Sequence, residues 1–277
     1  MISIFGGSYP GFWVAFFFTN QKKIKRMIKL IFIIVMVLSV GIFLGACNSG
    51  NQKAETVAEQ IVKKVEPSIV KHIFTAEEQA KLTPDQVLQD FQEGNNRFRN
   101  NELTVRDHKE QVRQSAPGQY PKAVVLSCLD SRVPVEDVFD QGIGDVFVGR
   151  VAGNFVNEDL LGSMEFACKV AGAKLIMVMA HQHCGAIKAA IDDVKLGNIT
   201  AMLSKIKPAV TMSQKFEGEK SSKNEAFVKD VAQNNVRNTI KNIREKSPIL
   251  KEMEAKGEIK IVGAFYTLTK GELLMIE

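Results

Sequence analysis

The stretch Val124-Val-Leu-Ser-Cys128-Leu-Asp130-Ser-Arg132 joins a short apolar run to a thiol, a carboxylate and a guanidinium group. The run over residues 123–127 has no charge and is rich in valine, as in a parallel strand that is buried on both faces. Comparable apolar runs occur later in the chain, over residues 145–149, 175–180 and 259–266. We expect these four runs to be strands of one sheet.

Segments with helical signals alternate with these runs. Thr83-Pro-Asp-Gln86 is typical of a helix start, because Thr can cap, Pro suits the first turn and Gln completes a capping box. Further helices are expected over residues 134–140, 158–171, 185–196 and much of 204–250. The alternation predicts an α/β domain in which helices flank a mainly parallel central sheet.

The beginning of the chain has the pattern of a targeting signal. Basic residues between Lys22 and Lys29 precede an uncharged apolar stretch, residues 30–44, which is short for a membrane span but suits a signal-peptide core. Leu44-Gly-Ala-Cys47 then resembles a bacterial lipobox, in which the cysteine becomes the lipidated first residue of the mature protein. An uncleaved membrane anchor is the alternative interpretation. A start at Met27 would account for the apolar patch upstream of the basic residues.

These signals divide the chain into three parts. We expect residues 1–46 to be a removed upstream segment and signal peptide, 47–82 a lipid-anchored tether, and 83–277 the catalytic domain. Both interpretations of the apolar stretch place the domain in the cell envelope, outside the cytoplasm and beside a membrane. Asn48, which follows the lipidated cysteine, favours an outer membrane if the cell has one.

The net charge of +5 does not indicate a nucleic-acid partner. The basic residues ahead of Cys47 account for it, and without them the chain holds 31 basic and 31 acidic residues. A balanced mature protein lacks the basic surface that binds nucleic acid.

The remaining cysteines point to a metal site. Apart from Cys47 there are three, and an odd number in an oxidising compartment argues against a disulfide framework. Cys128 follows one predicted strand, and His181 and Cys184 follow another. Since the carboxyl ends of parallel strands meet at one edge of a sheet, the three side chains can converge there. Two thiolates and one imidazole form a catalytic zinc set that leaves the fourth position to water.

Asp130 and Arg132 lie beside this set in the sequence. Zinc with two thiolates and a neutral imidazole has no net charge, so it should acidify its water less than a three-histidine site does. Asp130 can orient that water, and Arg132 can hold the carboxylate away from the metal with a bidentate ion pair. The alternative is a helix-capping Asp beside a surface Arg. We interpret His183 as an exposed or outer polar residue rather than as a proton shuttle.

Cys128-Leu-Asp130-Ser-Arg132 and the later His181-x-x-Cys184-Gly185 together resemble the paired signature of the β-class carbonic anhydrases. The likeness covers roughly residues 83–275 and includes Thr83-Pro-Asp, Glu93-Gly-Asn-Asn-Arg-Phe98, Phe139-Asp-Gln-Gly142, Arg150-Val-Ala-Gly-Asn154 and Gly263-Ala-x-Tyr266. The resemblance implies one Zn²⁺ per subunit and a lyase that reversibly hydrates carbon dioxide to bicarbonate and a proton.

The resemblance also implies residues that contact the substrate. Gln119 stands where the family's dimer brings a Gln to the partner's site, Phe147 where it has an apolar substrate contact, and Phe166 where plant-type members have Tyr. A homodimer or a higher even oligomer is therefore expected. The subgroup with a bicarbonate pocket has Trp and Gly where this chain has Val125 and Ser127, which favours the plant-like subgroup.

Two other functions stay open. The same fold and metal can attack another small heteroallene, such as carbonyl sulfide or carbon disulfide. A zinc-binding lipoprotein without enzymatic activity is the second alternative, although it would be expected to lack Asp130 or Arg132.

Overall fold

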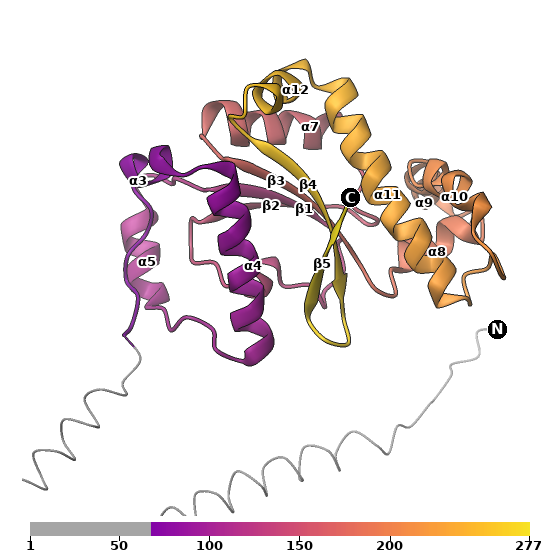
Figure 1. The fold of residues 1–277 in the computed structure, drawn as a ribbon, viewed down its shortest axis with the longest axis horizontal. Coiled ribbons are helices and arrows are strands. Elements are labelled where there is room, and N and C mark those ends of the chain that lie inside the picture. Colours follow the sequence, from indigo (N-terminus) through magenta and orange to yellow (C-terminus); the bar gives the residue numbers. More distant parts are fainter. Residues whose placement is uncertain (1–67) are drawn as a thin grey trace, which may run out of the picture. The chain divides into compact units, whose positions relative to one another are not determined.

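Five strands form one sheet in the part of the chain that the computed structural model describes, residues 68–277 (Figure 1). The strand order is β2-β1-β3-β4-β5, and the first four strands are parallel. The strands are β1 (Ala123–Ser127), β2 (Val146–Arg150), β3 (Leu175–His181), β4 (Lys260–Thr267) and β5 (Glu272–Ile276). The predicted mainly parallel α/β fold is confirmed.

The four predicted strands begin and end within one residue of their expected positions. β5 was not predicted. It runs antiparallel to β4, after a turn that ends at Gly271, whose φ is 65°. Its pairing depends on contact with β4, and its residues are half-buried or exposed at the edge of the sheet, so no buried apolar run marks it.

Helices cover both faces of the sheet and create two apolar cores. Along β1, Val124 and Leu126 pack into the core beneath α7 (Glu158–Glu165) and α11 (Glu225–Lys246), whereas Val125 packs into the core beneath α4 (Pro84–Asn100). Every residue of β1 is therefore buried. This two-sided burial, which β3 shares, explains why β1 and β3 appear in the sequence as continuous apolar runs.

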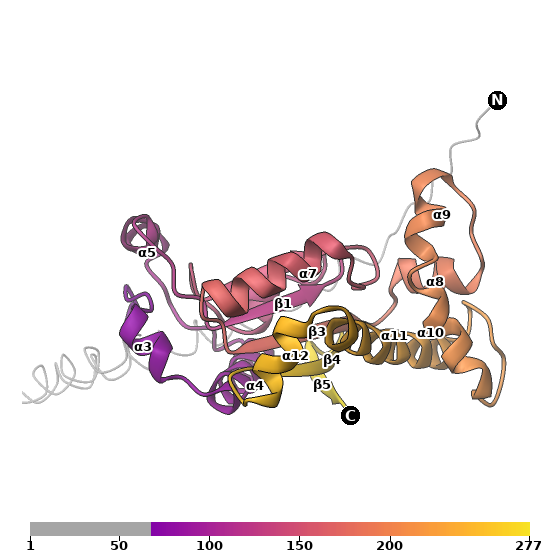
Figure 2. The same ribbon diagram turned by 90° about the horizontal axis from the view of Figure 1, so that it is seen from above.

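The remaining helices are shorter. The predicted helix over 158–171 continues beyond α7 as a π-helical turn, η1 (Phe166–Val170), and α8, α9 and α10 lie together at one end of the sheet (Figure 2). The long polar region contains α10, the 3₁₀ turn η2, α11 and α12 rather than one helix. The elements are α5 (His108–Ser115), α6 (Val135–Val138), α8 (Gly185–Ile191), α9 (Gly197–Leu203), α10 (Lys207–Met212), η2 (Ser213–Lys215) and α12 (Pro248–Ala255).

The start of α4 has the predicted capping box: the Thr83 hydroxyl accepts a hydrogen bond from the Gln86 amide, and the Gln86 side chain accepts one from the Thr83 amide. Folded structure extends upstream of it, into the predicted tether. In α3 (Ala76–Lys81), the buried Gln79 donates hydrogen bonds to the carbonyls of Pro121 (2.7 Å) and Ala171 (2.8 Å). The predicted signal peptide and Cys47 lie outside the described residues.

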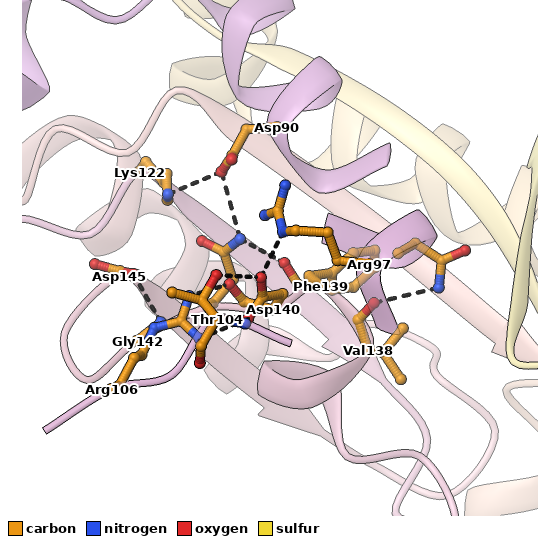
Figure 3. Close-up of polar contacts among 12 residues, drawn as sticks. Asp90, Arg97, Thr104, Arg106, Lys122, Val138, Phe139, Asp140, Gly142 and Asp145 are labelled. Carbon is orange, nitrogen blue, oxygen red and sulfur yellow. Dashed lines mark hydrogen bonds and ion pairs between the residues drawn. The ribbon is translucent and has the colours of Figure 1, made fainter. Parts of the chain in front are cut away.

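A buried ion network fixes the segment that leads into β2 (Figure 3). The side chain of Asp140 is fully buried and accepts hydrogen bonds from Arg97 Nε (2.6 Å), Arg106 Nη1 (2.6 Å) and the Thr104 hydroxyl (2.7 Å). The Arg106 side chain also donates to the Asp140 carbonyl. The network thereby ties α4 and the segment before α5 to the loop between α6 and β2.

Candidate zinc site

The three expected zinc ligands come together at the carboxyl end of the sheet. Cys128 follows β1, His181 is the last residue of the neighbouring strand β3, and Cys184 ends the turn that leads into α8. Their ligand atoms lie within 4.8 Å of one another, and all three residues are buried. The two sulfurs are 3.9 Å apart.

This donor set fits zinc. Two sulfurs that each lie about 2.3 Å from one tetrahedral zinc are separated by about 3.8 Å, close to the observed sulfur–sulfur distance. His181 Nδ1 is 2.8 Å from the Gln182 carbonyl oxygen, while His181 Nε2 is buried without a hydrogen-bond partner. A buried nitrogen that lacks a protein partner is suited to bind a metal, and the bond at Nδ1 fixes the orientation of the ring.

The two ligand thiols differ electrostatically from the third cysteine. A hydrogen bond from Cys184 lowers the pKa of Cys128, to about 4, whereas the same bond and burial raise the pKa of Cys184. Without metal the two sulfurs therefore share one proton. Burial raises the pKa of Cys168 to about 12, which keeps it a neutral thiol in the core.

Asp130 and Arg132 form a two-pronged ion pair at the edge of the site. Arg132 Nε lies 2.9 Å from Asp130 Oδ1, and Arg132 Nη2 lies 2.7 Å from Asp130 Oδ2. The Arg132 amide also donates to Oδ1. The Arg132 guanidinium holds the pKa of the Asp130 carboxyl well below its usual range, so the group is ionised at neutral pH. Asp130 Oδ2 is 3.7 Å from His181 Nε2, which places the carboxylate beside the ligand cluster.

The Gly153 amide and the Arg150 side chain make contacts around Cys128 that were not predicted from the sequence. The Gly153 amide donates a hydrogen bond to Cys128 Sγ (3.4 Å). Arg150, at the end of β2, donates to the Cys128 carbonyl (3.3 Å) and to the Val133 carbonyl (2.9 Å). The family-like stretch from Arg150 to Asn154 was the available signal, but sequence alone gave it no role.

His183 lies in the turn between the ligands His181 and Cys184. It has a left-handed backbone conformation, with φ of 56°, and its Nδ1 is 2.7 Å from Glu225 Oε2. Lys188 also donates to Glu225, so one carboxylate ties the turn to α8 and α11. A cavity of about 260 Å³ is lined by His181, His183 and Glu225, among others.

The residues expected to contact the substrate do not join the ligands within one chain. The rings of Phe147 and Phe166 have centroids 6.4 Å apart and line a groove of about 580 Å³ on the β2 side, which contains none of the three ligands. Gln119 is exposed and precedes β1, whereas Cys128 follows it. The length of that strand alone separates the two ends by about 13 Å.

Comparison with known proteins agrees with this geometry. Residues 123–273 match the family model described as carbonic anhydrase, a range that spans β1, the three ligands and β4. The chain belongs to the carbonic anhydrase family. Its reaction is the zinc-dependent, reversible hydration of carbon dioxide to bicarbonate and a proton.

Individual relatives belong to the same family. Carbonic anhydrase 2 of Mycobacterium tuberculosis is 33% identical over 165 residues, covering 58% of this chain and 76% of that protein. The β-carbonic anhydrase CafA of Aspergillus fumigatus is 25% identical, with a TM-score of 0.55 over 62% of this chain and 82% of that one. The Coccomyxa β-carbonic anhydrase, solved with acetazolamide, is 27% identical, with a TM-score of 0.53 over 59% and 75%.

Proposed function

We propose that this carbonic anhydrase is tethered to a membrane, belongs to the plant-like subgroup, and works with Asp130 and Arg132 beside an open zinc position. The ion pair between Asp130 and Arg132 carries the proposal. Both carboxylate oxygens are occupied by Arg132, so Asp130 is held as an acceptor near the ligands instead of serving as a fourth ligand.

The three ligand side chains define what the metal supplies. When bound, zinc lowers the pKa of a water molecule at its open position and so provides a nucleophile for carbon dioxide. Cys128, His181 and Cys184 would hold it, and their two thiolates cancel its charge. Such a neutral site needs support from the protein in orienting the water molecule.

Asp130 provides that support in the proposed mechanism. Its ionised carboxylate accepts a hydrogen bond from the water molecule and orients a lone pair of the water oxygen toward carbon dioxide. Arg132 keeps the carboxylate in that position and prevents it from moving toward the metal. The reaction joins the water oxygen to the carbon of carbon dioxide and gives bicarbonate, and the proton that the water loses would pass to buffer.

Two apolar surfaces support the proposed dimer. The outer edge of β2 has no neighbouring strand within the described residues, and Phe147 on this strand lines the groove beside η1. Phe166 is 54% exposed and Val170 is 71% exposed, both in η1. A second chain that covers this surface would bring its own Gln119, Phe147 and Phe166 toward the zinc site of the first, where they would contact carbon dioxide.

The assignment to the plant-like subgroup rests on the strand that precedes the first ligand. Val125 is fully buried and Ser127 ends β1, and they stand where the subgroup with a bicarbonate pocket has Trp and Gly. The ion pair between Asp130 and Arg132 is consistent with a subgroup in which water can reach the zinc at neutral pH.

The membrane anchor depends on residues outside the described part of the chain. Among the described residues no helix combines the length and the apolar character that a bilayer span requires. The lipobox at Cys47 supports lipid attachment, with 1–46 removed, residues 47–82 as a tether whose last part is bound to the domain through α3, and 83–277 as the catalytic domain in the cell envelope. Labelling of cells with a clickable fatty acid should mark the wild-type protein, whereas Cys47→Ser should remain unlabelled and unprocessed.

The alternative substrates can be tested with the same purified protein. Membrane-inlet mass spectrometry follows oxygen-isotope exchange from carbon dioxide and the loss of carbonyl sulfide or carbon disulfide. We expect fast isotope exchange and little consumption of the sulfur compounds at full zinc occupancy. Faster consumption of a sulfur compound would favour a heteroallene hydrolase, and inactivity toward all three would favour a zinc-binding lipoprotein.

A further inference from the structure

Helix α11 holds the turn that contacts the Cys128 sulfur. Asn235 Nδ2 donates a hydrogen bond to the Gly153 carbonyl (2.7 Å), and the Thr239 hydroxyl donates one to the Asn154 carbonyl (3.3 Å). Asn235 is fully buried, and Thr239 is 1% exposed. Both side chains are thus shielded from solvent, and both donate to backbone carbonyls of the same turn.

The turn can reach Cys128 only because residue 153 is glycine. Gly153 has a φ of 86°, a conformation that side chains other than glycine rarely adopt. A Cβ atom there would overlap Ile206 and would come within 3.3 Å of the Ala186 Cβ at the start of α8. The backbone is thus packed between α8 and α11, where its amide donates to Cys128 Sγ at 3.4 Å.

A hydrogen bond to a ligand thiolate changes what the sulfur gives to the metal. An N–H group draws negative charge from the sulfur, which then donates less electron density to zinc. In a site where two thiolates cancel the metal charge, this withdrawal preserves part of the metal's ability to polarise water. Hydrogen-bond donors to the Cys128 sulfur should therefore affect the acidity of the zinc-bound water more than donors to a ligand in a three-histidine site do.

We propose that Asn235 is a positioning residue for the zinc site: through the Gly153 carbonyl it fixes the amide that donates to the Cys128 thiolate. Asn235 Oδ1 is buried and has no hydrogen-bond partner, so the bond to the Gly153 carbonyl is the polar contact that orients the Asn235 side chain. The inference rests on the proposed function insofar as the thiolate is a zinc ligand of an active enzyme. Its tests do not depend on turnover.

The first test compares two variants of α11. Asn235→Leu keeps the number and branching of the side-chain heavy atoms but removes the donor to Gly153, and Thr239→Val removes only the donor to Asn154, one helical turn away. In the cobalt-substituted protein, loss of the N–H···S bond should shift the sulfur-to-cobalt charge-transfer band to lower energy in Asn235→Leu. Because the turn beside Cys128 also loses the contact that positions it, the same variant should bind zinc about 10-fold more weakly in a chelator competition, although its sulfur is the stronger donor. Thr239→Val should resemble the wild type in both measurements.

A second measurement needs no variant. In the cadmium-substituted wild-type protein, a hydrogen bond from Gly153 to the ligand sulfur should give a scalar coupling between the Gly153 amide proton and the metal. Absence of this coupling would overturn the proposal, as would a folded Asn235→Leu protein with the wild-type band and zinc affinity. If Asn235→Leu does not fold, Asn235→Ser replaces it in both measurements, because the shorter serine side chain cannot reach the Gly153 carbonyl. The same results are then required of Asn235→Ser.

These results separate the two proposals. The cadmium coupling and the cobalt band report on Asn235 and Gly153 whether or not the protein turns over carbon dioxide. A protein that shows both signals but hydrates no carbon dioxide would contradict the proposed function and leave the positioning role intact. A protein that hydrates carbon dioxide but shows neither the cadmium coupling nor the shift of the cobalt band in Asn235→Leu would support the proposed function and contradict the positioning role.

Discussion

Arg132 binds both carboxylate oxygens of Asp130, at 2.9 and 2.7 Å, at the edge of the zinc-ligand cluster. In the proposed mechanism this ion pair keeps the Asp130 carboxylate from becoming a fourth zinc ligand. Asp130 Oδ2 lies 3.7 Å from His181 Nε2, and the ion pair and the hydrogen bond from the Arg132 amide hold the carboxylate in this position. Arg132 is itself half exposed, so the pair can be altered without disturbing the core.

Removal of Arg132 should reduce carbon dioxide hydration strongly. In Arg132→Ala, Asp130 loses its two charge-assisted hydrogen bonds and becomes free to approach the metal, so kcat/KM should fall about 10- to 100-fold. Arg132→Lys keeps the charge but not the two-pronged geometry, and it should lie between Arg132→Ala and the wild type. Stopped-flow kinetics at equal zinc occupancy measure both. Unchanged kcat/KM in Arg132→Ala would remove Arg132 from the mechanism.

The Asp140 network should stabilise the fold in a pH-dependent way. Burial acts to raise the pKa of Asp140, but hydrogen bonds from Arg106, Thr104 and Arg97 outweigh it and hold the pKa below its ordinary value. Since the folded-state pKa is depressed, the stabilisation is complete above the unfolded-state pKa of about 3.9 and is lost as the pH falls through the folded-state value. Asp140→Asn should lower the free energy of unfolding by about 3 kcal/mol at neutral pH.

Urea unfolding at neutral pH and below about pH 4 tests this window. The difference between wild type and Asp140→Asn should narrow in acid. Asp193→Asn is the matched control, because Asp193 also has a left-handed backbone, with φ of 55° against 50° at Asp140, but is exposed. It should change stability little, and a constant difference for Asp140→Asn across the pH range would contradict the assignment.

The sheet and the ligand set could be predicted because their signals are local. Each buried parallel strand is a continuous apolar run, and Cys128, His181 and Cys184 follow directly after two of them. The direction in which those side chains point follows from the fold, which places the carboxyl ends of β1 and β3 side by side.

Other parts of the structure depend on contacts between distant residues. Asn235 lies 82 residues from Gly153, and Arg106 lies 34 residues from Asp140, so no local pattern pairs them. The π-helical turn at Phe166 interrupts a segment whose sequence is consistent with a regular helix. β5 is defined by its pairing with β4 rather than by its own composition.

The exposed aromatic side chain of η1 should matter for assembly. Phe166→Asp places a charge on the surface proposed to meet a second chain, so the variant should elute as a monomer and lose activity. Leu196→Asp is the control, because Leu196 is exposed to a similar degree, 62% against 54% for Phe166, but lies at the start of α9. Size-exclusion chromatography with light scattering gives the masses. A dimeric, active Phe166→Asp protein would place the interface elsewhere.

Removal of zinc should expose a difference between the cysteines. The hydrogen bond from Cys184 lowers the pKa of Cys128, whereas burial raises the pKa of Cys168 to about 12, so Cys128 is the more nucleophilic thiol. After chelation, iodoacetamide should modify Cys128 more than about 10-fold faster than Cys168. Mass spectrometry of the alkylated peptides measures the rates, with urea-unfolded protein as the reference for equal access. Zinc should protect Cys128, and equal labelling with and without metal would contradict its role as a ligand.

The most direct test of the central claim is the initial rate of carbon dioxide hydration, measured by stopped flow on purified, zinc-loaded protein. The wild type should hydrate carbon dioxide, and its rate should follow the zinc content. Cys184→Ser, which removes one ligand, should reduce the rate to the uncatalysed background, and Asp130→Asn should reduce it while zinc stays bound. A fully zinc-loaded wild-type protein that does not exceed the uncatalysed rate would contradict the assignment.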